Sequence, residues 1–128
     1  MSPTKIVALG LIGLVVFGPL SSQSETYSTE PARFSIVIKS RKVDTSERTI
    51  RTTQGMDVEI NFTADEAVEL HLHGYDQLLT VKPGSVAVMR LHDKIAGRFA
   101  IEGHHFGSGA GGTRSRGHTV LLYLEVHP

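Results

Sequence analysis

Alternation of apolar and polar residues with a period of two restricts the possible folds of this chain more than any other feature of its sequence. The segment 56–62 alternates at every position, and segments 34–39 and 68–73 follow the same pattern. Successive side chains of a strand point to opposite faces, so this period predicts half-buried β-strands. Shorter apolar runs at 78–81, 86–91, 99–102 and 120–126 predict further strands. Residues 40–51 are charged and only weakly patterned, and we expect a short strand near 49–53.

Turn residues separate these segments. Glycine, proline and aspartate mark turns at 54–55, 74–76, 82–84 and 96–97. Short strands with turns at this spacing are typical of a sandwich of two sheets. We therefore predict an all-β sandwich of seven to eight short strands without a long helix.

The N-terminal segment has a different character. Residues 6–20 form an almost unbroken apolar run behind one lysine, and small residues follow it at 21–24. The run is short for a bilayer-spanning helix and has the layout of a secretory signal peptide. We predict a signal peptide at 1–24, a disordered lead at 25–33 and one domain at 34–128, in a periplasmic or secreted protein without a stable membrane span after cleavage. An uncleaved anchor is the alternative.

Composition excludes several kinds of partner and chemistry. The 128 residues carry equal numbers of acidic and basic side chains, a balance that does not favour nucleic acid as a partner. The chain contains no cysteine. Neither a disulfide nor a thiolate metal ligand can therefore form.

Histidine supplies the main candidates for chemistry, with seven residues in the chain. His71 and His73 stand at strand spacing, so both side chains should lie on the face opposite the apolar residues, where Glu69 also lies. Two neighbouring imidazoles can ligate one copper, zinc or nickel ion. The alternative is that both belong to a solvated strand face and hydrogen bond to Glu69 or other neighbours.

A glycine-rich segment at 103–118, predicted to be one long loop, carries the other candidates. If it folds back over the turn at 74–76, it can complete a set of three or four ligands. The predicted metal ligands are His71, His73, His104, His105 and His118. His92 and His127 lie in a predicted turn and at the C-terminus, where we expect solvated side chains.

We find no catalytic constellation. Residues 107–112 match the glycine spacing of nucleotide-binding loops, but no βαβ unit surrounds them. Ser108 and Ser115 lie in the same glycine-rich segment, which has no strand-to-helix elbow to hold a serine against a base. We therefore expect that the protein is not an enzyme.

Three segments together resemble the cupredoxin-like domain family, in small exported members that lack the type 1 copper cysteine. These are VELHLHGYDQLLTVKPG at 68–84, GRFAIEGHHFGSG at 97–109 and HTVLLYLEVHP at 118–128. The resemblance covers 34–128 and implies a Greek-key β-sandwich. In electron-transfer members, a ligand cysteine, a histidine and often a methionine follow the strand that corresponds to 99–102.

The resemblance assigns ligands only in part. It implies that the family's first ligand histidine corresponds to His71 or His73, and its loop histidine to His104, His105 or His118. The thiolate and thioether ligands correspond to no residue here, so a blue-copper electron carrier is excluded.

The leading hypothesis is an exported protein that binds copper, or a similar divalent metal, through a histidine-only site for sequestration or delivery. The expected partners are the metal ion and a protein of the cell envelope. One alternative is a metal-free cupredoxin-fold module with a structural or protein-interaction role. A third hypothesis, a relative of Cu,Zn superoxide dismutase, is weaker because the disulfide cysteines of that family are absent.

Overall fold

The computed structural model describes residues 18, 30–43, 46, 48–92, 95–107 and 117–128. Apart from residue 18, the predicted signal peptide lies outside these residues, as does the part of the predicted lead at 25–29. Within the described part of the chain, no helix is long and apolar enough to cross a membrane.

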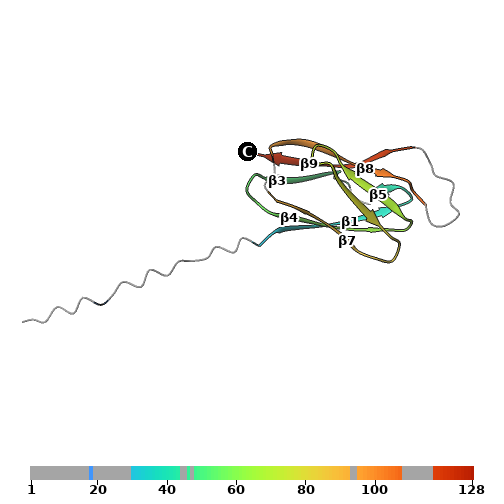
Figure 1. Cartoon of the computed structure of the whole chain (residues 1–128), viewed down its shortest axis with the longest axis horizontal. Coiled ribbons are helices and arrows are strands. Elements are labelled where there is room, and N and C mark those ends of the chain that lie inside the picture. Colours follow the sequence, from blue (N-terminus) through green and yellow to red (C-terminus); the bar gives the residue numbers. More distant parts are fainter. Residues whose placement is uncertain (1–17, 19–29, 44–45, 47, 93–94, 108–116) are drawn as a thin grey trace, which may run out of the picture.

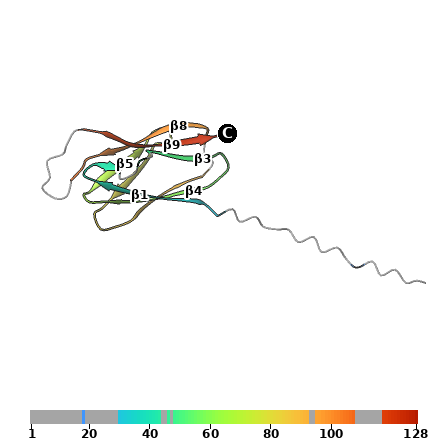
Figure 2. The ribbon, with the colours of Figure 1, turned by 180° about the vertical axis from the view of Figure 1, so that it is seen from behind.

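The described residues form nine strands and no helix. The strands are β1 (Ala32–Lys39), β2 (Lys42–Val43), β3 (Thr49–Thr53), β4 (Val58–Ala64), β5 (Val68–Leu72), β6 (Gln77–Val81), β7 (Ala87–Leu91), β8 (Gly97–His104) and β9 (Thr119–His127). They build a four-stranded sheet in the order β2-β1-β4-β7 and a five-stranded sheet in the order β3-β9-β8-β5-β6. The two sheets lie face to face as two layers (Figure 1), and the reverse view shows the same arrangement (Figure 2). The prediction of an all-β sandwich is confirmed.

The apolar residues of the period-two segments form the core between the sheets. On β4, Val58, Ile60 and Phe62 are at most 1% exposed, and alternate residues of β5 from Val68 to Leu72 are at most 2% exposed. Full burial of one such side chain stabilises the fold by about 1.5–3 kcal/mol. The core therefore fixes which face of each strand remains available for a site.

The count of nine strands exceeds the predicted seven to eight because of β2. This strand has two residues and pairs with β1 across a tight turn in which Ser40 and Arg41 have φ angles of 49° and 62°. Two residues are too few to show a period. The period of two also does not show whether neighbouring strands are parallel. Strands β1 and β4 pair in parallel, as do β3 and β9, and the other pairs are antiparallel.

The prediction that a loop begins at residue 103 was wrong, because β8 continues through His104. Gly103 lies inside this strand, and a Cβ atom there would come within 2.5 Å of the buried Phe106 ring and 3.1 Å of Leu121. A glycine is needed because other side chains fill the space beside its Cα. The sequence alone does not separate this role from the role of a loop glycine.

A β-bulge interrupts the pairing of β8 with β9. Ile101 is opposite Leu122, whereas Glu102 is opposite Val120, so Leu121 is one extra residue in β9. Leu121 and Leu122 are consecutive and both buried. Bulges of this kind redirect the side chains on one side of the irregularity.

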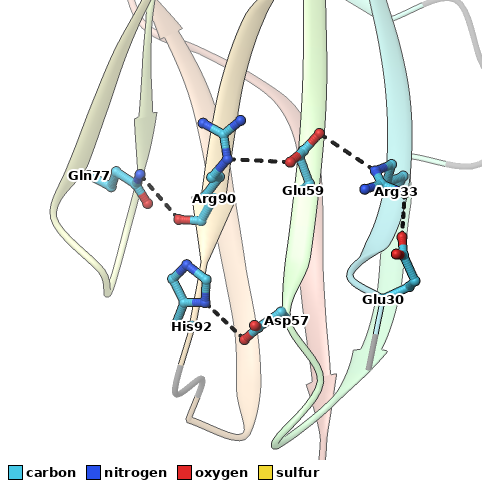
Figure 3. Close-up of polar contacts among 7 residues, drawn as sticks. All are labelled: Glu30, Arg33, Asp57, Glu59, Gln77, Arg90 and His92. Carbon is cyan, nitrogen blue, oxygen red and sulfur yellow. Dashed lines mark hydrogen bonds and ion pairs between the residues drawn. The ribbon is translucent and has the colours of Figure 1, made fainter. Parts of the chain in front are cut away.

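The outer face of the four-stranded sheet carries charge pairs (Figure 3). Glu59 on β4 lies 3.3 Å from the Nε atom of Arg90 on β7 and 3.8 Å from that of Arg33 on β1, and Arg33 also pairs with Glu30 at 3.0 Å. Exposed pairs of this kind contribute at most about 1 kcal/mol each. This face is thus occupied by complementary charges, and the predicted site residues lie on the other sheet.

Candidate metal centre

Strand β5 brings the first two candidate ligands together. Its alternate residues from Val68 to Leu72 face the core, so Glu69 and His71 lie on the outer face of the five-stranded sheet. His73 follows the strand, and its backbone N–H donates to the carbonyl of Ala100. The rings of His71 and His73 are 4.2 Å apart between centroids. The predicted side-by-side placement is confirmed.

The turn after His73 fixes its position. Gly74 has a φ of 80°, and a Cβ atom at this residue would come within 2.5 Å of the Phe99 ring. Tyr75 packs edge-on against Phe99 at 4.9 Å, and its hydroxyl donates to the carbonyl of Ile95. This aromatic contact anchors the turn next to the candidate ligand.

Strand β8 supplies the third histidine. In the antiparallel pairing of β5 with β8, Glu69 is opposite His104 and His71 is opposite Glu102. Glu102 and His104 therefore share the outer face with His71, while Gly103 between them faces inward. The ring centroids of His71 and His104 are 5.9 Å apart.

Three histidines form a group that can hold one metal ion. One potential ligand nitrogen from each of His71, His73 and His104 lies within 4.8 Å of the other two. In a tetrahedral site with metal–nitrogen bonds of about 2.0–2.1 Å, ligand nitrogens are about 3.4 Å apart. Small side-chain rotations would close this difference. The side chains are 23%, 46% and 26% exposed, in that order, so an ion has access from solvent.

Carboxylates surround this histidine triad. The Nε2 atom of His73 hydrogen bonds to Oε2 of Glu102 at 3.0 Å, and the Nε2 atom of His71 lies 3.3 Å from Oδ1 of Asp76. Burial disfavours ionisation of Glu102, but the hydrogen bond from His73 and the nearby charges of His73, His118 and His104 outweigh burial and lower the pKa of Glu102. An ionised carboxylate beside the triad favours a bound cation.

The Nε2 atom of His104 is buried and has no hydrogen-bond partner among the residues that the structure describes. It lies 3.5 Å from Oε2 of Glu102, without the alignment of a hydrogen bond. An unsatisfied buried nitrogen costs about 1–3 kcal/mol. A small rotation of the His104 ring that lets Nε2 hydrogen bond to Oε2 of Glu102 would therefore stabilise the fold.

The remaining predicted ligands lie at the edge of the triad. The ring centroids of His105 and His118 are 6.2 Å and 5.9 Å from that of His104. The Nδ1 atom of His105 lies 3.5 Å from Oε1 of Glu69. All five predicted residues thus gather on one sheet face, and a ligand role for any of them stays a prediction.

His92 and His127 lie away from this group, each next to a carboxylate. The His92 side chain, which directly follows β7, is exposed, and its Nδ1 atom is 2.9 Å from Oδ1 of Asp57, which directly precedes β4 (Figure 3). His127 lies 3.2 Å from Glu125 on β9. Their polar environments agree with the expected surface positions.

Glu102 is the site residue that sequence reasoning missed. A usable signal was present, because Glu102 precedes His104 by two residues and so shares its face in any strand. The incorrect loop boundary at residue 103 concealed this relationship.

Fold and site define a class: a two-layer β-sandwich with a sulfur-free histidine group on one outer sheet face. No protein-family model matches the chain, and no curated protein matches its sequence significantly. Among solved structures, a chain of a heme-copper terminal oxidase dimer is similar at a TM-score of 0.52 and 17% identity, over 94% of this chain and 78% of that one. The blue copper oxidase from Nitrosomonas europaea is similar at 0.53 and 17% identity, over 77% of this chain and 39% of that one.

Identities at this level establish the fold alone. The chain has a cupredoxin-like fold, which agrees with the fold that the sequence resemblance implied.

Proposed function

We propose that this protein binds copper(II) or a similar divalent metal ion through His71, His73 and His104, and that it sequesters or delivers the ion outside the cytoplasm. The proposal rests on one observation, the three histidine nitrogens that lie within 4.8 Å of one another. Imidazole nitrogen suits copper and zinc. The cupredoxin-like fold supports copper as the ion.

The chemistry of the donor atoms favours binding over electron transfer. The chain has no cysteine, and of its methionines Met89 is buried in the core and Met56 precedes β4 on the opposite sheet. Without a sulfur ligand, the site lacks the covalency of a blue-copper centre. Its position on an open sheet face suits exchange of the ion with a partner protein, and we propose no catalytic step.

Copper loading with EPR spectroscopy tests this proposal. The wild-type protein should bind one equivalent of Cu(II) with nitrogen hyperfine structure and without thiolate-to-copper absorption. The His71→Ala/His73→Ala variant should lose this signal. The His92→Ala/His127→Ala variant removes the same number of histidines elsewhere and should retain it. A wild-type stoichiometry near zero, or equal binding by both variants, would refute the proposal.

A metal-free role is the second candidate, because one observation favours it. His71, His73 and His105 each lie within 3.5 Å of a carboxylate oxygen. These contacts also fit a polar network on the surface that binds no metal ion. This candidate expects the same thermal unfolding with chelator as with copper.

A further inference from the structure

Each histidine of the triad directs the same ring nitrogen towards a carboxylate. Nε2 of His73 is 3.0 Å and Nε2 of His104 is 3.5 Å from the same oxygen, Oε2 of Glu102. Nε2 of His71 is 3.3 Å from Asp76. The other ring nitrogen, Nδ1, is therefore the one left to ligate in all three residues.

The protonation of imidazole makes this pattern informative. A neutral ring carries one N–H and one lone pair, so a nitrogen that donates to a carboxylate leaves the opposite nitrogen as the metal ligand. Carboxylates that accept from a ligand histidine fix its tautomer and orientation, and their removal typically weakens metal binding.

Glu102 is better placed for this role than the other acids nearby. Its side chain is 14% exposed, whereas that of Asp76 is fully exposed and that of Glu69 is 37% exposed. It also stands opposite His71 in the pairing of β5 with β8. One nearly buried carboxylate thus lies beside His73, which follows β5, and beside His104 of β8.

The unsatisfied Nε2 atom of His104 gives a second, independent observation. Within the described part of the chain this buried nitrogen has no hydrogen-bond partner, and Oε2 of Glu102 is 3.5 Å away. A slight rotation of the ring would let Nε2–H donate to that oxygen. With the proton on Nε2 donated to Glu102, the lone pair of His104 lies on Nδ1 and is available to a metal ion.

We propose that Glu102 is a positioning residue of the metal centre: its carboxylate accepts hydrogen bonds from Nε2–H of His73 and His104, and both residues ligate the ion through Nδ1. This assignment rests on the proposed function. It specifies the ligand atoms and adds Glu102, which does not itself bind the ion. The group of mutually close ligand atoms likewise contains the three histidines and not Glu102.

Two measurements test the assignment. Long-range 1H–15N NMR of the metal-free protein above the pKa of histidine should show the Nε2–H tautomer for His73 and His104, and Zn(II) should then shift their Nδ1 resonances. Chelator competition with Zn(II) and Cu(II) should show affinity about 10- to 100-fold weaker in Glu102→Gln. Glu102→Ala serves as a second variant in case the amide disturbs folding.

Glu69→Gln is the matched control, because Glu69 lies on the same face but contacts His105. This variant should leave the tautomers of His73 and His104 unchanged and the affinity within about twofold of wild type, because the Glu69 carboxylate lies beside His105. The assignment alone is refuted if His71→Ala/His73→Ala abolishes binding but both Glu102 variants bind like wild type. It is also refuted if Zn(II) coordinates Nε2, seen as loss of the Nε2–H proton of His73 and His104. If wild type binds neither ion, the proposed function fails together with the assignment.

Discussion

The replacement Gly103→Ala should destabilise the domain through one steric conflict. The new Cβ atom would lie 2.5 Å and 2.9 Å from two atoms of the Phe106 ring and 3.1 Å from a methyl carbon of Leu121. Carbon atoms pack best at about 3.5–4.0 Å, so the ring must move by about 1 Å. Phe106 is 3% exposed and has little room to do so.

The expected magnitude follows from two opposing effects. Overpacking of a core costs about 1–3 kcal/mol, and replacement of a strand glycine by alanine recovers about 0.5–1 kcal/mol of chain entropy. Two ring atoms and a methyl group are involved at once, so we expect a net loss of about 1–2 kcal/mol. This is a measurable share of the roughly 5–15 kcal/mol that stabilises a typical domain.

Urea unfolding at 25 °C, monitored by circular dichroism, measures this loss. A double-mutant cycle with Phe106→Leu identifies its cause, because leucine lacks the ring atoms closest to the new methyl group. The double variant should be more stable than the sum of the single effects by about 1 kcal/mol. Gly84→Ala is the control: its φ is 75° and no atom lies within 4 Å, so its cost should be additive with Phe106→Leu. A loss below about 0.5 kcal/mol for Gly103→Ala, or additivity in its cycle, would refute the steric argument.

Three further predictions follow. Zn(II) at one hundred times its dissociation constant should stabilise wild type by about 2.7 kcal/mol, as seen in thermal unfolding, and an equal effect on His71→Ala/His73→Ala would contradict the proposed site. The fold lowers the pKa of Glu102 below its ordinary value of 4.5, so the ionised carboxylate stabilises the fold above pH 4.5, and this contribution is lost as the pH falls through the folded-state pKa. Acid titration of metal-free Glu102→Gln should therefore show a smaller loss of stability below pH 4.5 than wild type. Parallel titration curves for the two proteins would contradict this prediction. Arg98 lies 4.0 Å over the Tyr123 ring, so Arg98→Gln should cost about 0.5–1 kcal/mol in urea, and an equal cost in a Tyr123→Leu background would exclude a cation–π contribution.

The predictable part of this molecule is local. A period of two depends only on neighbours in sequence, and it located the buried face of β4 and β5. The same rule placed His71 beside His73. Local geometry therefore supplied most strands and two members of the triad.

The remaining site depends on contacts between distant segments. His104 joins the triad because β8 pairs with β5 in one particular register, and no pattern within either strand specifies that register. The strand character of Gly103 depends on the rings and methyl groups packed beside it, which the sequence does not reveal. For the same reason, Glu102 was not recognised.

The bulge at Leu121 shows how one break in the alternation of a strand can select a residue for a surface. Because Leu121 and Leu122 both face the core, the odd–even order of β9 reverses at this point. Counting back from Leu121, the reversed order assigns His118 to the outer face, where its ring lies 5.9 Å from that of His104. If β9 alternated regularly through Leu121, Leu121 and Thr119 would face outward and His118 would face inward. The bulge therefore decides, as much as the identity of residue 118 does, that a histidine lies at this edge of the site.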